Sequence, residues 1–145
     1  MRALVQRVSS ASVAVGGEVV GAIGRGLCTF VGVTQADDAA VAERLARRVW
    51  GLRIFPDARG DSNLSAEELG LEVLVVSQFT LYADTSRGRR PSFVRAAPAQ
   101  QAERLVDAVT ASLVKLGARV ATGRFGASMQ VRLVNEGPFS LLVEV

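Results

Sequence analysis

Short apolar runs alternate with turn-forming residues along the first quarter of the chain. Four of these runs fit β-strands: residues 2–8, 11–15, 18–23 and 27–33. A Gly-Gly pair at 16–17 separates the second run from the third. Such a pair suits a two-residue hairpin because both residues can adopt positive φ. This part of the chain therefore predicts antiparallel strands joined by tight turns.

Two later stretches have the four-residue apolar spacing of an amphipathic helix. The first follows Asp37-Asp38, which can cap a helix N-terminus, and its apolar stripe is Val41, Leu45 and Val49. The second begins at Pro98 and is expected to end before Gly117, and its stripe is Leu105, Val109, Leu113 and Leu116. The chain is therefore expected to form two main helices.

The remaining segments predict one helical turn and several more strands. Ser65 and Glu68 have the spacing of a capping box. Gly137-Pro138 is expected to form a turn between the last two of the extended segments, which are residues 52–55, 71–79, 118–122, 129–134 and 139–145. Strands joined by tight turns favour antiparallel pairing. We therefore predict a single α+β domain over residues 1–145, with a curved, mainly antiparallel β-sheet or small barrel and two main helices.

Several kinds of chemistry are excluded by residues that the chain lacks. It has 145 residues, no histidine, and a single cysteine, Cys28. Catalysis by Ser-His-Asp or Cys-His groups and zinc binding through histidine are therefore impossible. We expect no metal site and no cofactor. Cys28 lies in an apolar run and is expected to be a small buried residue rather than a nucleophile.

The positive charge of the chain is concentrated in one segment. The net charge is +3, and residues 84–95 carry Arg87, Arg89, Arg90 and Arg95 against Asp84. The other residues therefore balance to zero. Such a local excess is consistent with an anion-binding site, although a solvated arginine-rich loop gives the same pattern.

Three segments are candidates for functional sites. The glycine-rich run 21–26 lacks the following helix that a phosphate-binding loop requires, and is interpreted as a turn. Polar residues close the most apolar strand at 77–80, where hydroxyl, amide and backbone N–H groups can orient a ligand; a strand end followed by a turn explains them equally well. Residues 135–139 form either a functional loop with a cis X-Pro bond or a plain hairpin turn.

Eight stretches of the sequence together resemble the D-aminoacyl-tRNA deacylase family, also called D-tyrosyl-tRNA deacylases. They are MRALVQRV at the start, GAIGRGL at 21–27, LRIF at 52–55, NLS at 63–65, SQFTL at 77–81, GRRPSF at 88–93, TGRFGASM at 122–129 and NEGPFS at 135–140. Their order and spacing match the family from end to end. The sequence departs from the family at Ser140, where threonine is usual, and little change is expected there because the hydroxyl is kept. It also departs before Asn63, where Gly60-Asp61-Ser62 stands and the family often has a lysine and a methionine, so no contact is expected from those positions.

The resemblance implies a cytoplasmic homodimer with active sites at the subunit interface. The implied reaction is hydrolysis of the ester that joins a D-amino acid to the 3′-terminal adenosine of tRNA. The pocket would be lined by Ser77, Gln78, Phe79 and Thr80. A cis Gly137-Pro138 pair from the other subunit, fixed by Arg7, would exclude L-amino acids, and the terminal adenosine would lie near Phe125, Gly126 and Met129.

Two mechanisms are compatible with this resemblance. In one mechanism Thr80 is the nucleophile, and in the other a ribose hydroxyl of the tRNA assists attack by water. The second is favoured because no histidine is available to activate a hydroxyl. A filter made of rigid backbone would also let glycine through, because glycine has no Cβ.

The arginine-rich segment is a candidate for binding the tRNA backbone. Arg87, Arg89 and Arg90 are candidates for contacts with tRNA phosphates.

Three other functions compete with the deacylase. They are a non-catalytic nucleic-acid-binding protein of the same fold, a general esterase and a dimerisation module. The esterase is disfavoured because no G-x-S-x-G motif is present, and no membrane-spanning segment is expected.

Overall fold

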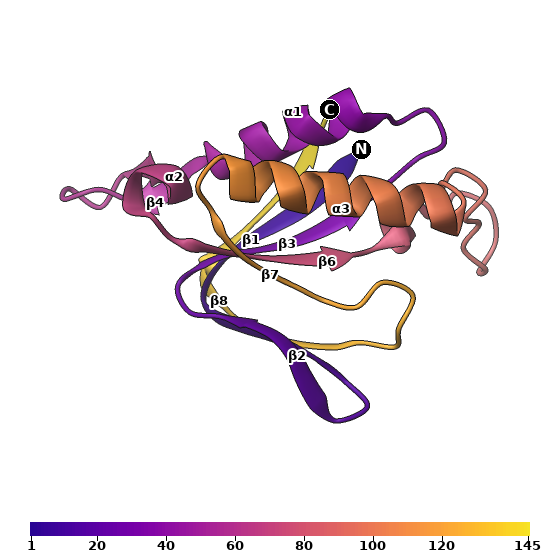
Figure 1. Ribbon diagram of the computed structural model, residues 1–145, viewed down its shortest axis with the longest axis horizontal. Coiled ribbons are helices and arrows are strands. Elements are labelled where there is room, and N and C mark those ends of the chain that lie inside the picture. Colours follow the sequence, from indigo (N-terminus) through magenta and orange to yellow (C-terminus); the bar gives the residue numbers. More distant parts are fainter.

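A curved six-stranded sheet, with helices α1 and α3 on one of its faces, makes up most of the molecule (Figure 1). The computed structural model describes residues 1–145. The sheet contains β1 (Arg2–Val15), β2 (Glu18–Ile23), β3 (Gly26–Gly32), β6 (Glu72–Ser77), β7 (Arg119–Thr122) and β8 (Gln130–Glu144). A small separate sheet contains β4 (Arg53–Pro56) and β5 (Ser62–Ser65). The helices are α1 (Ala39–Trp50), α2 (Ala66–Leu69) and α3 (Ala99–Lys115), with a 3₁₀ turn η1 (Phe79–Tyr82).

The strand order combines antiparallel and parallel pairs. The order is β2-β1-β3-β6-β7, and β8 pairs with β1. All three partners of β1 are antiparallel to it, whereas β3–β6 and β6–β7 are parallel. The parallel pairs follow from the helices, because α1 and α3 carry the chain back across the sheet. The predicted α+β class with a curved sheet and two main helices is confirmed, and the sheet is mixed.

The hydrophobic core lies on both faces of the sheet. The larger cluster, of 23 buried residues, joins the apolar stripes of α1 and α3 to the sheet through side chains such as Leu45, Val109 and Val5. A smaller cluster of seven fills the concave side between β1, β2, β3 and β6. Cys28 belongs to this second cluster and is fully buried, as predicted, and its burial raises the pKa of the thiol to about 12.

Local sequence signals produce the expected turns and caps. Gly16 and Gly17 have φ values of 59° and 85° and join β1 to β2, which confirms the predicted hairpin. The Asp38 carboxylate accepts a hydrogen bond from the Val41 N–H at 2.9 Å and caps α1. The capping box predicted from Ser65 and Glu68 is present at the start of α2. None of the helices combines the length and the apolar character that a membrane-spanning helix requires.

Two predicted strand breaks are wrong. Residues 2–8 and 11–15 belong to the single strand β1, and residues 129–134 and 139–145 belong, except at their ends, to β8. Both halves of β8 pair with β1, and the register shifts where the breaks were expected. The interruptions are therefore bulges within two long paired strands, which increase strand twist without reversing the chain.

Glycines allow the first hairpin to approach the parallel strands closely. An ideal Cβ on Gly26 would lie 2.0 Å from the carbonyl oxygen of Glu72, and one on Gly21 would lie 2.4 Å from that of Thr122. These are backbone atoms within the sheet, so they cannot move aside without a cost. The segment from Gly21 to Gly26 forms the expected turn and leads directly into β3, and its glycines also allow close packing, which was not predicted.

We predict that Gly26→Ala lowers the free energy of unfolding by about 3 kcal/mol, because the methyl group forces β3 away from β6. Gly24→Ala is the matched control. Its Cβ would lie 3.4 Å from the flexible Glu72 carboxylate, and we expect a change of about 0.5 kcal/mol or less. Urea denaturation of both variants measures the difference, and equal losses would contradict this explanation.

Candidate functional site

The polar residues at the end of β6 leave the sheet in an ordered turn. Ser77 is the last residue of β6, and the Gln78 N–H still donates to the carbonyl of Val31 at 2.8 Å. The chain then enters η1, in which the side chains of Phe79 and Thr80 are exposed. The Gln78 side-chain amide donates to the Thr80 hydroxyl. The strand end therefore presents a hydroxyl, an amide and an aromatic ring on a rigid support.

A cavity of about 760 Å³ lies beside this strand end. Its walls come from the end of β6, from the segment 93–99, from the first half of α3 and from the loop between β7 and β8. Most of the lining side chains are hydrophobic. A concave, mainly apolar site of this size with a few convergent polar groups is typical of small-molecule binding.

The cavity brings together six residues that the sequence singled out, namely Ser77, Gln78, Phe79, Phe125, Gly126 and Met129. Thr80 does not line it and lies at its margin, held by Gln78. The lining also includes Phe93, which sequence reasoning did not assign. Its ring contacts that of Phe79 edge to face, with centroids 5.0 Å apart. The sequence did contain one signal that Phe93 could be functional, because it lies in the family-like GRRPSF stretch.

No titratable side chain lines the cavity. The polar groups available there are the Ser77 hydroxyl, the Gln78 amide and backbone N–H and C=O groups. No cluster of histidine, cysteine, aspartate or glutamate side chains that could hold a metal ion is present. The arrangement can bind an apolar or planar group and orient a polar one, but it supplies no strong acid or base.

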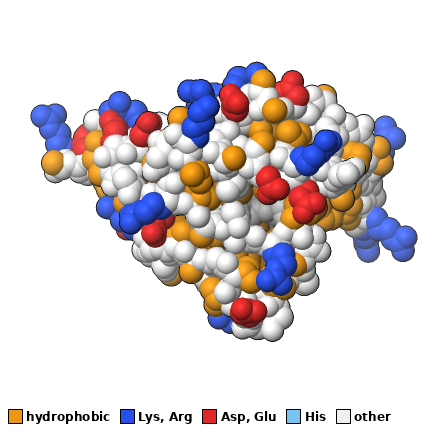
Figure 2. All heavy atoms as spheres, viewed as in Figure 1, with side chains coloured by type: hydrophobic (Ala, Val, Ile, Leu, Met, Phe, Trp, Pro, Cys, Tyr) orange, Lys and Arg blue, Asp and Glu red, His pale blue; other side chains and the backbone are white.

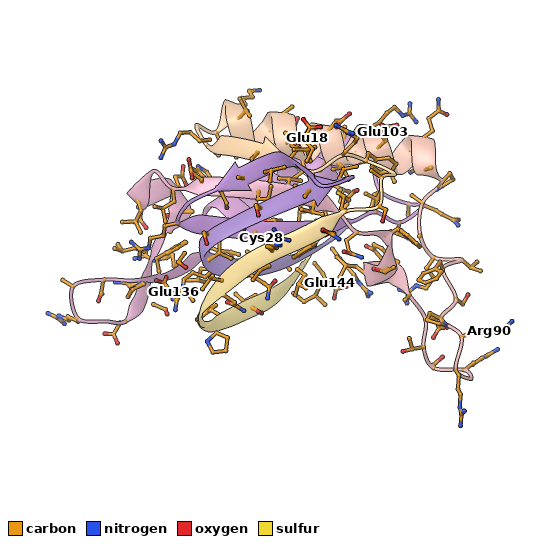
Figure 3. All side chains as sticks on the ribbon, turned by 90° about the horizontal axis from the view of Figure 1, so that it is seen from below. Glu18, Cys28, Arg90, Glu103, Glu136 and Glu144 are labelled. Atoms are coloured by element: carbon orange, nitrogen blue, oxygen red, sulfur yellow. The ribbon has the colours of Figure 1, made fainter.

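The arginine-rich loop adjoins the cavity. Main-chain hydrogen bonds of 2.8 and 2.9 Å between Asp84 and Ser92 close its base. Hydrogen bonds from Ser86 to the Asp84 carboxylate lower the pKa of that carboxyl group. Basic side chains project at several places on the surface (Figure 2), and Arg90 projects from this loop (Figure 3). Arg87, Arg89 and Arg90 are all exposed and form no ion pair.

The second predicted functional segment is a bulge in β8 rather than the expected hairpin turn. Gln6 pairs with Ser140 and Val8 pairs with Asn135, so four residues of β8 lie opposite one residue of β1. The Asn135 carboxamide oxygen accepts from the Phe139 N–H at 2.9 Å and bridges the bulge. The turn prediction is wrong because both flanks of the bulge pair with the same strand.

The bulge presents an exposed Gly137-Pro138 pair, and the peptide bond between them is cis. Arg7 lies beneath this pair. Its Nε donates to the Glu136 carbonyl at 3.0 Å, its Nη1 donates to the Ile54 carbonyl, and its guanidinium lies 4.8 Å from the centre of the Phe139 ring. The structure thus brings Arg7 together with the Gly137-Pro138 bulge.

The bulge does not reach the cavity of its own chain. None of Arg7, Gly137 and Pro138 lines the cavity. Figure 3 shows Glu136, at the start of the bulge, and Arg90, in the arginine-rich loop, on opposite sides of the molecule. One chain alone therefore does not combine the two predicted parts of the site.

Curated proteins from other organisms match almost the whole chain. A protein of Nocardia farcinica is 58% identical over 147 residues, covering 99% of both chains, and one of Streptomyces coelicolor is 57% identical over 146 residues, covering 100% of both. Both are named D-aminoacyl-tRNA deacylase.

Two solved structures have the same fold. The c-Myc DNA unwinding element binding protein is 39% identical, with a TM-score of 0.94, over 100% of this chain and 99% of the other. A probable eukaryotic D-amino acid tRNA deacylase is 18% identical and has a TM-score of 0.88. This match covers 99% of this chain and 98% of the other. The model of the D-Tyr-tRNA(Tyr) deacylase family matches residues 4–144. With the relatives above at more than half identity over their full length, the chain belongs to this family of deacylases.

Proposed function

We propose that this protein is a D-aminoacyl-tRNA deacylase, which hydrolyses the ester between a D-amino acid and the 3′-terminal adenosine of tRNA. One observation carries the proposal: the end of β6 and the loop between β7 and β8 line one cavity of about 760 Å³. These are the segments that the family resemblance assigns to the aminoacyl group and the adenosine. The names of the full-length relatives from two genera support the same activity.

The cavity suits both halves of this substrate. The aromatic ring of Phe79 and the apolar residues of the α3 wall can contact an amino-acid side chain, while Ser77 and Gln78 offer polar groups to its amine and carbonyl. We assign the adenine to the side of the cavity formed by Phe125, Gly126 and Met129. Stacking and apolar contacts at this position are typical of recognition of an unpaired terminal base.

The proposed hydrolysis relies on positioning and on stabilisation of the oxyanion. Water attacks the carbonyl carbon of the ester, the bond to the ribose oxygen breaks, and that oxygen takes up a proton. An aminoacyl ester is already activated, so oriented N–H donors and a neighbouring ribose hydroxyl are sufficient. The absence of titratable side chains from the cavity lining agrees with this route. Thr80 binds through its hydroxyl to Gln78 and has no base to activate it.

We assign the selection against L-amino acids to the Gly137-Pro138 bulge of a second subunit. The pair is exposed, is held by Arg7 through Glu136, and lies outside the cavity of its own chain. A backbone carbonyl placed beside the substrate Cα would collide with a Cβ on one side only. Glycine, which has no Cβ, would be hydrolysed as well. Under this proposal the protein is a proofreading enzyme, and it acts in the cytoplasm, where tRNA is charged.

The proposed homodimer is supported by the outer edge of β8. This strand pairs only with β1, so its other edge has unpaired backbone groups. Val134 and Leu142 on β8 are 57% and 55% exposed, although both are large and apolar. Association of two chains would cover this surface and bring each bulge toward the other chain. Sedimentation equilibrium tests the dimer, and a protein that is monomeric at assay concentrations would exclude it.

A nucleic-acid-binding protein without catalytic activity remains the second candidate function. It is favoured by the high similarity to the c-Myc DNA unwinding element binding protein and by the arginine-rich loop. A binding protein has no use for a stereochemical filter, so an assay of chirality separates the two candidates.

The first prediction concerns substrate chirality. We expect the purified protein to release tyrosine rapidly from D-Tyr-tRNA, to spare L-Tyr-tRNA, and to hydrolyse Gly-tRNA, because only the L form carries a Cβ toward the backbone filter. Release of labelled amino acid from the three matched tRNAs measures this. Inert D-Tyr-tRNA would refute the enzyme assignment, and inert Gly-tRNA alone would refute the steric account of selection.

The second prediction concerns Thr80. We expect Thr80→Ala to lower the rate constant of ester hydrolysis by about tenfold or less, the effect of removing one hydrogen bond, because the hydroxyl orients Gln78 and does not attack the ester. Single-turnover deacylation of D-Tyr-tRNA at saturating protein concentration measures this constant apart from binding and product release. Thr80→Ser is the control that keeps the hydroxyl. A reduction of about a thousandfold in the alanine variant, restored by serine and with binding intact, would instead identify Thr80 as the nucleophile.

The third prediction concerns the arginine-rich loop. We expect Arg89→Glu with Arg90→Glu to weaken tRNA binding and to reduce the slope of log K against log salt by about one for each phosphate that is no longer bound. The control is Arg44→Glu with Arg47→Glu, which makes the same charge change on the exposed face of α1. Filter binding at several salt concentrations measures both. Equal effects of the two double variants would show that only net charge matters.

A further inference from the structure

Glu136, the first residue of the β8 bulge, places one carboxylate oxygen between two arginines. Its Oε2 lies 3.7 Å from the Arg7 Nε and 4.0 Å from the Arg25 Nε. This oxygen is buried and has no hydrogen-bond partner, although the side chain as a whole is 42% exposed. A carboxylate oxygen shielded from water is costly unless cations compensate its charge. Glu136 is therefore held by charge from two sides.

The two arginines come from different elements and share one support. Arg7 lies on β1, whereas Arg25 lies in the turn between β2 and β3. The guanidinium of Arg7 donates to the carbonyl of Ile54, and that of Arg25 lies 5.5 Å from the centre of the Phe55 ring. Phe55 is fully buried, so β4 forms a firm base for both side chains.

Arg7 restrains both the main chain and the carboxylate of Glu136, whereas Arg25 restrains the carboxylate alone. Arg7 binds the main-chain carbonyl at 3.0 Å, immediately before the Gly137 nitrogen. Arg25 reaches only the side-chain carboxylate. A single ion pair between partly exposed groups leaves the carboxylate free to turn, whereas contacts from two elements fix its direction and with it the main chain at residue 136.

We propose that Arg25 and Glu136 are positioning residues for the Gly137-Pro138 pair, and that the Arg25–Glu136–Arg7 bridge sets how strictly the enzyme rejects L-aminoacyl-tRNA. This inference rests on the proposed function. It assigns a role in specificity to a turn residue, Arg25, that touches neither the bulge backbone nor the cavity. Selection then depends on how little the bulge moves, and not only on its shape.

The test compares Arg25→Gln, Glu136→Gln and the double variant with the wild type, using D-Tyr-tRNA and L-Tyr-tRNA. We expect each single variant to lower the ratio of D to L hydrolysis by about fivefold, the scale of a partly exposed ion pair. The double variant should lose no more than the larger single loss, because both substitutions break the same bridge. Arg25→Lys, which keeps the charge, should restore at least half of the ratio. Arg59→Gln, at an exposed arginine without an ion pair, is the matched control.

Hydrogen exchange at the Phe139 amide provides a readout that does not depend on activity, since this amide donates to Asn135 across the bulge. We expect about fivefold faster exchange in Arg25→Gln and Glu136→Gln, and no change in Arg59→Gln. The inference is overturned, and the proposed function stands, if the wild type selects D-Tyr-tRNA and the two variants keep both its exchange rate and its D to L ratio. Faster exchange in a protein that hydrolyses neither substrate would overturn the function and support the positioning role of the bridge.

Discussion

Strand β1 forms backbone hydrogen bonds along both of its edges, and this pairing determines where each functional segment lies. Its first half lies between β3 and β8, and its second half lies between β2 and β8. Through β3 it fixes the parallel partner β6, at whose end the Ser77–Phe79 segment lines the cavity. Through β8 it fixes the bulge opposite Arg7. A strand saturated on both edges has little freedom to shift in register, because any slip would break two ladders at once.

The features that sequence alone predicted well are those fixed by neighbouring residues. The Gly16-Gly17 hairpin, the Asp38 cap and the capping box at Ser65 all depend on contacts within about four positions. The apolar run of β6 was also predicted, but the strand ends at Ser77 rather than at Phe79, because the chain turns into η1 at that point. In the same way, the burial of Cys28 followed from the apolar residues around it. The co-location of the SQFTL and TGRFGASM stretches at one cavity came from the family resemblance, since no local pattern indicates it.

The features that sequence reasoning missed depend on distant pairing. Asn135–Phe139 has the composition of a turn, yet it is a bulge because both flanks find the same partner strand more than a hundred residues away in the chain. The polar residues Ser9 and Ser10 likewise interrupt the apolar alternation without interrupting β1. The parallel pairs β3–β6 and β6–β7 result from the two helical crossovers, whereas the tight turns elsewhere favoured antiparallel pairing. Phe93 was missed because its place in the cavity wall depends on how the arginine-rich loop returns to α3.

The separation of the bulge from the cavity has a consequence for how the protein behaves at low abundance. Under the proposed function, a complete site exists only where two chains meet, so the population of working sites obeys mass action. Dilution below the dissociation constant of the pair would then remove selectivity without unfolding either chain. Proofreading capacity would rise more steeply than in proportion to the amount of protein made. The expression level of the protein would thereby help to set the fidelity of proofreading, independently of the residues in the site.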